Sequence, residues 1–151
     1  MATTTRTDET TTRELDWPTE LMLQLSWHWE NQLRPRLDGL TDEEYFWEPV
    51  PGCWSVRPRG QGVALEVGNG ELIIDWAMPQ PDPPPVTTIA WRLAHLIVAV
   101  FGDRNARYFG GPPTSYDTRA YPGTAKQALA ELDEEVDRWL TGVSGGSISP
   151  G

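Results

Sequence analysis

The sequence predicts a mainly α-helical bundle built from three long helices. Three segments, 16–37, 87–109 and 124–140, carry apolar residues at the spacing of helical turns. Each is bounded by residues that start or stop helices. Only the segment 63–76 has the alternation typical of β-strands. A chain of 151 residues is long enough for one domain with a single core.

We expect the first helix to begin at Asp16, with Pro18 in its first turn, and to end near Leu37. Apolar residues repeat along it at intervals of three and four and form one stripe: Met22, Leu25, Trp29, Leu33 and Leu37. Trp29 lies at the centre of this stripe. His28 lies about 100° around the helix from Trp29, at the edge of the stripe.

A short helix and a hairpin follow. Thr41 and Glu44 have the spacing of a capping box, which predicts a helix start. Pro49 limits that helix to a few residues. The alternating segment 63–76, with its Gly-Asn-Gly turn at 68–70, predicts a β-hairpin. Two strands are marginally stable alone, so the hairpin must pack on the helices.

The second long helix is the most apolar. From Ile89 to Phe101, only Arg92 and His95 are polar, so this helix has no clean solvent face. Two threonines can cap its start, and Gly110 ends it. We therefore expect the 87–109 helix to be the central helix of the bundle.

His95 is the most informative residue of the sequence. Its helical face also carries Ala99 and Gly102, which are small and leave room for a metal, a water or another side chain. From spacing alone, a core histidine hydrogen-bonded to a neighbour is the commoner arrangement. His28 is expected either to be half-exposed or to face the same cavity as His95.

The third long helix is predicted to run from Thr124 to about Leu140. Thr124 and Gln127 have capping-box spacing. Its apolar residues form one stripe: Ala128, Leu129, Leu132, Val136, Trp139 and Leu140. The acidic residues between them form a solvated face.

The net charge of the chain excludes some classes of binding partner. A net charge of −10 repels phosphate backbones and anionic lipid surfaces, so we expect neither nucleic acid nor membrane as a partner. Small molecules are compatible with this charge. Eight tryptophans, spread along the chain, predict an aromatic-rich core or an aromatic-lined pocket.

One cysteine, Cys53, excludes an internal disulfide and fits a reducing compartment. The first residues lack the apolar core of a signal peptide. We therefore expect a cytoplasmic protein, with a disordered Thr-rich tail over 1–14, one bundle domain over 15–143 and a flexible tail over 144–151.

Four stretches of the sequence carry a family resemblance: LDGLTDEEY at 37–45, WEP at 47–49, WSVR at 54–57 and TTIAWRLAHL at 87–96. They resemble the DinB/YfiT-like superfamily, and more narrowly its branch related to mycothiol-dependent maleylpyruvate isomerase. The resemblance covers roughly residues 17 to 141 in order.

The resemblance implies a four-helix bundle that binds a divalent metal, nickel, zinc or manganese, through three side chains. His95 matches the histidine ligand of the second long helix. The implied activity is a metal-dependent S-transferase or isomerase that uses a low-molecular-weight thiol such as mycothiol or bacillithiol. On this basis His95 and His28 are the candidate metal ligands, and Trp29, Trp91 and Arg92 are the candidate pocket residues.

The sequence also departs from this pattern. No histidine follows His95, and the fourth bundle helix, which carries the other ligands in the family, has no counterpart. The carboxylates of the third helix occupy no matched ligand position. We therefore expect an incomplete metal site, and whether the chain is an enzyme stays open. The alternative is a non-catalytic bundle that binds a ligand or forms a homodimer through the face left open by the missing helix.

Overall fold

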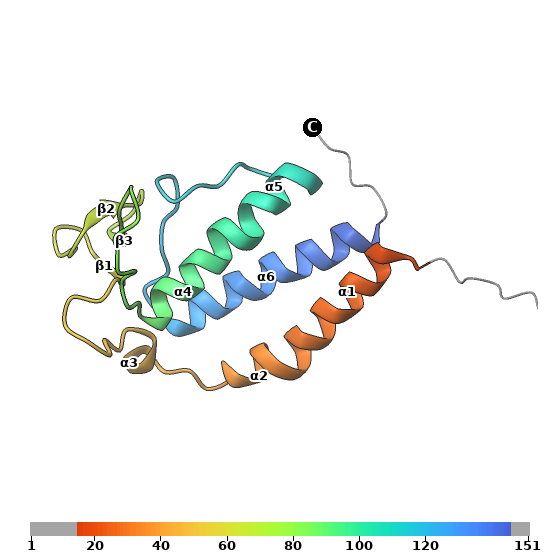
Figure 1. Cartoon of the computed structure of the whole chain (residues 1–151), viewed down its shortest axis with the longest axis horizontal. Coiled ribbons are helices and arrows are strands. Elements are labelled where there is room, and N and C mark those ends of the chain that lie inside the picture. Colours follow the sequence, from red (N-terminus) through yellow and green to blue (C-terminus); the bar gives the residue numbers. More distant parts are fainter. Residues whose placement is uncertain (1–14, 146–151) are drawn as a thin grey trace, which may run out of the picture.

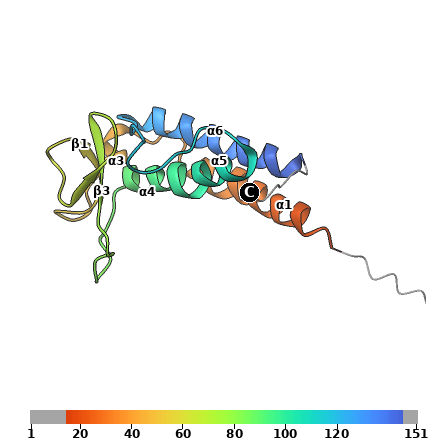
Figure 2. The same cartoon turned by 90° about the horizontal axis from the view of Figure 1, so that it is seen from above.

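A computed structural model describes residues 15–145 of the chain. The predicted tail over 1–14, and residues 146–151 of the predicted C-terminal tail, lie outside the described residues. Three long helices lie side by side, and a small antiparallel sheet covers one end of them (Figures 1 and 2). The mainly α-helical bundle predicted from the sequence is confirmed.

The first long helix is continuous through α1 (Trp17–His28), the π-helical turn η1 (Trp29–Leu33) and α2 (Arg34–Arg36). It begins one residue after the predicted start, because Asp16 is its N-cap: the Asp16 carboxylate accepts a hydrogen bond from the Thr19 backbone N–H. The predicted apolar stripe faces the bundle but is only half-buried. No residue of α1, η1 or α2 is fully buried.

The second long helix comprises α4 (Ile89–His95), the π-helical segment η2 (Leu96–Gly102) and α5 (Asp103–Phe109). Thr88 caps its start through its side-chain oxygen. Gly110 ends it with a φ of 77°, a left-handed conformation that glycine adopts without strain. Both ends lie where the sequence predicted them.

The third long helix, α6 (Ala125–Ser144), lies between the other two (Figure 1). The predicted N-cap is confirmed, because Thr124 Oγ1 accepts from the Gln127 backbone N–H at 3.2 Å. Both other long helices pack along α6, whereas α1 does not pack along α4–η2–α5. The central position predicted for the 87–109 helix is therefore wrong. Ala125 and Ala128, both fully buried, let the neighbouring helices approach α6 closely.

The short helix α3 (Asp42–Tyr45) joins the first helix to the sheet. Its capping box is confirmed: Thr41 Oγ1 accepts from the Glu44 backbone N–H, and the Glu44 carboxylate accepts from the Thr41 backbone N–H. Tyr45 is fully buried, and its hydroxyl donates to the Pro122 carbonyl at 3.2 Å. This contact holds α3 against the start of α6.

The sheet has three strands, β1 (Val56–Pro58), β2 (Leu65–Val67) and β3 (Leu72–Trp76), in the order β1-β3-β2. The predicted hairpin is β2 and β3. The third strand, β1, has no counterpart among the predicted strands. Its three residues, which end in a proline, are too few to show the alternation that predicts a strand. They form one because they pair with the edge of β3, with Val56 opposite Ile74.

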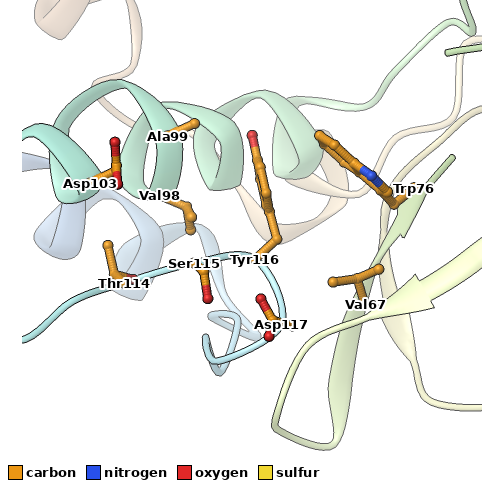
Figure 3. A pocket seen from close by; sticks show the side chains of 9 residues that line it. All are labelled: Val67, Trp76, Val98, Ala99, Asp103, Thr114, Ser115, Tyr116 and Asp117. Carbon is orange, nitrogen blue, oxygen red and sulfur yellow. The ribbon is translucent and has the colours of Figure 1, made fainter. Parts of the chain in front are cut away.

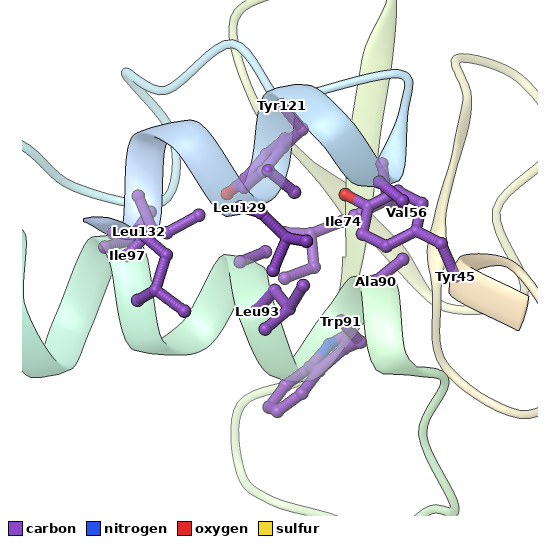
Figure 4. Close-up of a cluster of buried hydrophobic side chains, with 14 of the residues drawn as sticks. Tyr45, Val56, Ile74, Ala90, Trp91, Leu93, Ile97, Tyr121, Leu129 and Leu132 are labelled. Carbon is purple, nitrogen blue, oxygen red and sulfur yellow. The ribbon is translucent and has the colours of Figure 1, made fainter. Parts of the chain in front are cut away.

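The core lies between the sheet, α3, α4–η2 and α6 (Figure 4). Its labelled side chains are Tyr45, Val56, Ile74, Ala90, Trp91, Leu93, Ile97, Tyr121, Leu129 and Leu132. The first long helix contributes only half-buried side chains at the edge of this core. No helix of the described residues is long and apolar enough to cross a membrane.

Asp75 on β3 is a fully buried carboxylate that holds the sheet together. It accepts hydrogen bonds from the backbone N–H groups of Ser55 at 2.9 Å and Val63 at 2.8 Å. It also accepts from Arg57 Nε at 3.0 Å. One side chain therefore satisfies three donors from the two segments that flank β3, one at β1 and one before β2.

We predict that Asp75→Ala lowers the free energy of unfolding by about 3 kcal/mol, because it leaves buried donors and the Arg57 charge without their partner. Urea denaturation followed by circular dichroism measures this change. Asp137→Ala, at an exposed position of α6, is the control. Equal stability of the two variants would contradict the structural role of Asp75.

Candidate functional site

His95 ends α4 and lies half-buried between two aromatic rings. Its ring stacks on Trp91, one turn earlier, with centroids 5.4 Å apart and planes within 12° of parallel. On its other side, Nδ1 is hydrogen-bonded to the hydroxyl of Tyr116. Tyr116 belongs to the loop between α5 and α6, so this bond joins the helix to that loop.

The protonation states of this pair follow from burial. Burial lowers the pKa of His95, and the positive charges of Arg92 and Arg104 lower it further. Burial raises the pKa of Tyr116 to about 12. At neutral pH the imidazole is therefore uncharged and the phenol keeps its proton. The imidazole tautomer sets the direction of their hydrogen bond: Tyr116 donates when Nε2 carries the proton and accepts when Nδ1 carries it.

The contacts of four aromatic side chains form a closed cycle, completed by one hydrogen bond to the backbone. Tyr116 packs on Trp76 of β3 with ring centroids 4.4 Å apart. Trp91 Nε1–H donates to the backbone carbonyl of Asp75, the residue before Trp76, at 2.9 Å. Four side chains thus connect the helix, the loop and the sheet: Trp91, His95, Tyr116 and Trp76. We name these four side chains the aromatic ring network.

Two further hydrogen bonds fix the loop that carries Tyr116. The hydroxyl of Tyr121, a buried residue, donates to the Tyr116 carbonyl at 2.7 Å. The Asn69 backbone N–H, beside the sheet, donates to the Arg119 carbonyl at 2.8 Å. The loop is therefore held at several points against the sheet and the second helix.

A pocket of about 370 Å³ lies beside Tyr116, between η2–α5, the loop and the sheet (Figure 3). It is lined by Val67, Trp76, Val98, Ala99, Asp103, Thr114, Ser115, Tyr116 and Asp117. Ala99, singled out in the sequence as a small neighbour of His95, forms part of its wall. The space beside the other small neighbour, Gly102, is filled, because a Cβ there would lie 2.7 Å from the Thr114 methyl group.

Only some of the residues predicted for the site lie near His95 in the structure. Trp91 is buried against His95, and Arg92 is exposed, with its guanidinium 5.8 Å from the centre of the Trp91 ring. Trp29 is half-buried and His28 is exposed, both on the first long helix. That helix packs along α6 and not along α4–η2–α5, so the structure does not bring His28 to His95.

The metal site implied by the family resemblance needs three ligands. Among residues 15–145, no three His, Cys, Asp or Glu side chains come together as a metal ion requires. Nδ1 of His95 is also engaged by Tyr116. The described residues therefore do not fit such a site, and the assignment of His95 and His28 as ligands stays a prediction.

Sequence reasoning missed Tyr116 and Trp76, the two residues that complete the ring network. Tyr116 lies in a Gly- and Pro-rich loop without periodicity, and Trp76 ends a strand. The excess of tryptophan was the one signal that pointed to an aromatic-lined pocket.

A sequence model of the DinB superfamily matches residues 24–148. The chain belongs to the DinB superfamily. No curated protein and no solved structure matched the chain. The match extends from the first long helix through the end of α6, so this DinB-superfamily bundle includes both His95 and the loop that carries Tyr116.

We predict that the imidazole of His95 titrates below its ordinary pKa of about 6.5, because burial disfavours the charged ring. Because the pKa of His95 is lower in the folded than in the unfolded chain, the neutral imidazole adds to the free energy of unfolding above pH 6.5. This addition is lost as the pH falls through the folded-state pKa. NMR titration of the His28→Gln variant, which has one imidazole left, measures the value directly. A titration midpoint at or above the ordinary value would contradict the buried placement of His95.

Proposed function

We propose that this DinB-superfamily bundle binds a small organic molecule in the pocket beside Tyr116. The observation that carries the proposal is a pocket of about 370 Å³ whose wall is fixed by the aromatic ring network. Ligand sites in proteins are concave, mostly apolar and roughly 300–1,000 Å³ in volume. A few polar groups at their walls orient the ligand.

The polar groups of this pocket favour recognition over covalent chemistry. Ser115 is the one serine among the lining residues, and its hydroxyl is 2.9 Å from the Thr118 hydroxyl, with no base beside it. The imidazole of His95 is bonded to a phenol with a raised pKa. The described residues thus offer hydrogen-bonding groups without an activated nucleophile.

A metal-dependent thiol S-transferase or isomerase of the mycothiol or bacillithiol type is the competing proposal. Membership of the superfamily and the position of His95 on the second long helix support it. Its nickel, zinc or manganese ion would need ligands from outside residues 15–145 or from a second copy of the chain. The narrower kinship with the maleylpyruvate isomerase branch belongs to this proposal, whereas a missing fourth helix belongs to the non-catalytic alternative.

We predict that 2-phenylethanol, a neutral probe of pocket size, shifts the backbone amide resonances of Ala99, Thr114 and Tyr116 in the full chain. The variant Ala99→Phe fills the pocket and should abolish these shifts. The matched control is Ala130→Phe, at an exposed position of α6, which should bind like the wild type. Shifts that persist in Ala99→Phe would contradict the proposed site.

Metal analysis separates the two proposals. After growth with added nickel, zinc and manganese, the binding proposal expects far less than one metal ion per chain and unchanged probe binding in EDTA. A stoichiometric metal that is lost in His95→Ala would favour the thiol transferase instead. Glu134→Ala, at an exposed position of α6, is the control for non-specific loss.

A second role, self-association, is favoured by the exposed face of α1. Four large apolar residues of α1 are more than half exposed: Trp17, Leu21, Leu23 and Trp27. At about 250 Å² per tryptophan, the two indoles alone expose roughly 300 Å². A standard interface buries about 800 Å² per partner, so this face supplies a large part of one. We propose a second copy of the chain as its occupant.

We predict that the full chain is a dimer at micromolar concentration and that Trp27→Glu makes it a monomer, because a charge would be buried in the interface. Sedimentation equilibrium measures the mass. Trp47→Glu changes an equally exposed tryptophan beyond the end of α3 and should leave the dimer intact. A monomeric wild type would contradict this role.

A further inference from the structure

We propose that the pocket beside Tyr116 selects a cationic ligand, an ammonium ion that carries an aromatic or similarly apolar group. The inference rests on the proposed function and names the ligand class of the same site. It follows from three properties of the pocket wall: its shape, its charge and the hydrogen-bonding role of its polar atoms.

The pocket is polar at the helix end and aromatic at the sheet end. Figure 3 shows Asp103 on the helix at one end and Trp76 with Val67 at the other. The ring of Tyr116 rises from the loop between them. Asp117 lies on the same loop, below Tyr116 in this view. An elongated molecule with one polar and one apolar end matches this arrangement.

The charge of the lining is negative. Its two charged side chains are the carboxylates of Asp103 and Asp117, and no Lys or Arg of the described residues lines it. Asp103 is paired with Arg107 at 3.3 Å, but that guanidinium is 63% exposed, so solvent weakens the pair. Asp117 forms no ion pair among residues 15–145. With a net charge of −10 on the chain, the pocket attracts cations and repels anions.

The two charged groups of the wall act only as acceptors: they are the carboxylates of Asp103 and Asp117. The Tyr116 hydroxyl shares one hydrogen bond with Nδ1 of His95, in a direction set by the imidazole tautomer. A ligand therefore satisfies this wall by donating N–H groups, and an ammonium ion does so with charge-assisted hydrogen bonds.

The aromatic end suits the rest of the ligand. The ring centroids of Trp76 and Tyr116 lie 4.4 Å apart, and both rings line the pocket together with Val67. The apolar ring of a ligand can pack against these two rings. A volume of about 370 Å³ suits a ligand with a single ring.

The test compares 2-phenylethylamine, 2-phenylethanol and phenylacetate, which share a phenyl ring and differ in charge. NMR titration of the full chain gives the three dissociation constants. We expect the amine to bind about tenfold more tightly than the alcohol, since a charge-assisted hydrogen bond replaces a neutral one. Phenylacetate should bind most weakly, because both charged side chains of the lining, Asp103 and Asp117, carry the same charge as its carboxylate.

The double variant Asp103→Asn/Asp117→Asn should reduce amine binding to the level of the alcohol. The control Asp133→Asn/Asp137→Asn removes the same charge from α6 and should keep the preference. Equal binding of amine and alcohol to the wild type, both blocked in Ala99→Phe, would overturn the charge selection alone. A preference that survives in the double variant would also overturn it. No binding of either probe would overturn the proposed function as well.

Discussion

The buried carboxylate of Asp75 is the interaction on which the site depends. Its side chain joins Ser55, Val63 and Arg57 and so holds the three strands at one end of the helices. Its backbone carbonyl accepts from the Trp91 indole, which fixes the sheet to α4. An uncompensated carboxylate in this position would be costly, so the segments that donate to it are held in a single arrangement.

The pocket follows from that arrangement. Trp91 provides the surface on which His95 stacks, and His95 in turn binds Tyr116 of the long loop. The Tyr116 ring in turn packs on the ring of Trp76, the residue after Asp75 on β3. The pocket lies beside these contacts, between the loop and η2–α5, where Ala99 forms part of its wall.

Local signals in the sequence predicted most of the helix boundaries. The residues that start or end the long helices act within one turn of their own position, so the local sequence was sufficient to predict these boundaries. They are Asp16, Thr88, Thr124 and Gly110. The contact of His95 with Tyr116 was not predictable, because it depends on the path of an aperiodic loop. The separation of His28 from His95 depends equally on the order in which the helices pack. Spacing along one helix carries no information about either.

The aromatic ring network is the central claim, and nuclear Overhauser contacts between its rings test it most directly. In the full chain at neutral pH, the ring protons of Tyr116 should show contacts both to His95 and to Trp76. The account predicts both sets of cross-peaks. Their absence, with the Tyr116 ring in contact only with solvent-exposed loop residues, would contradict it.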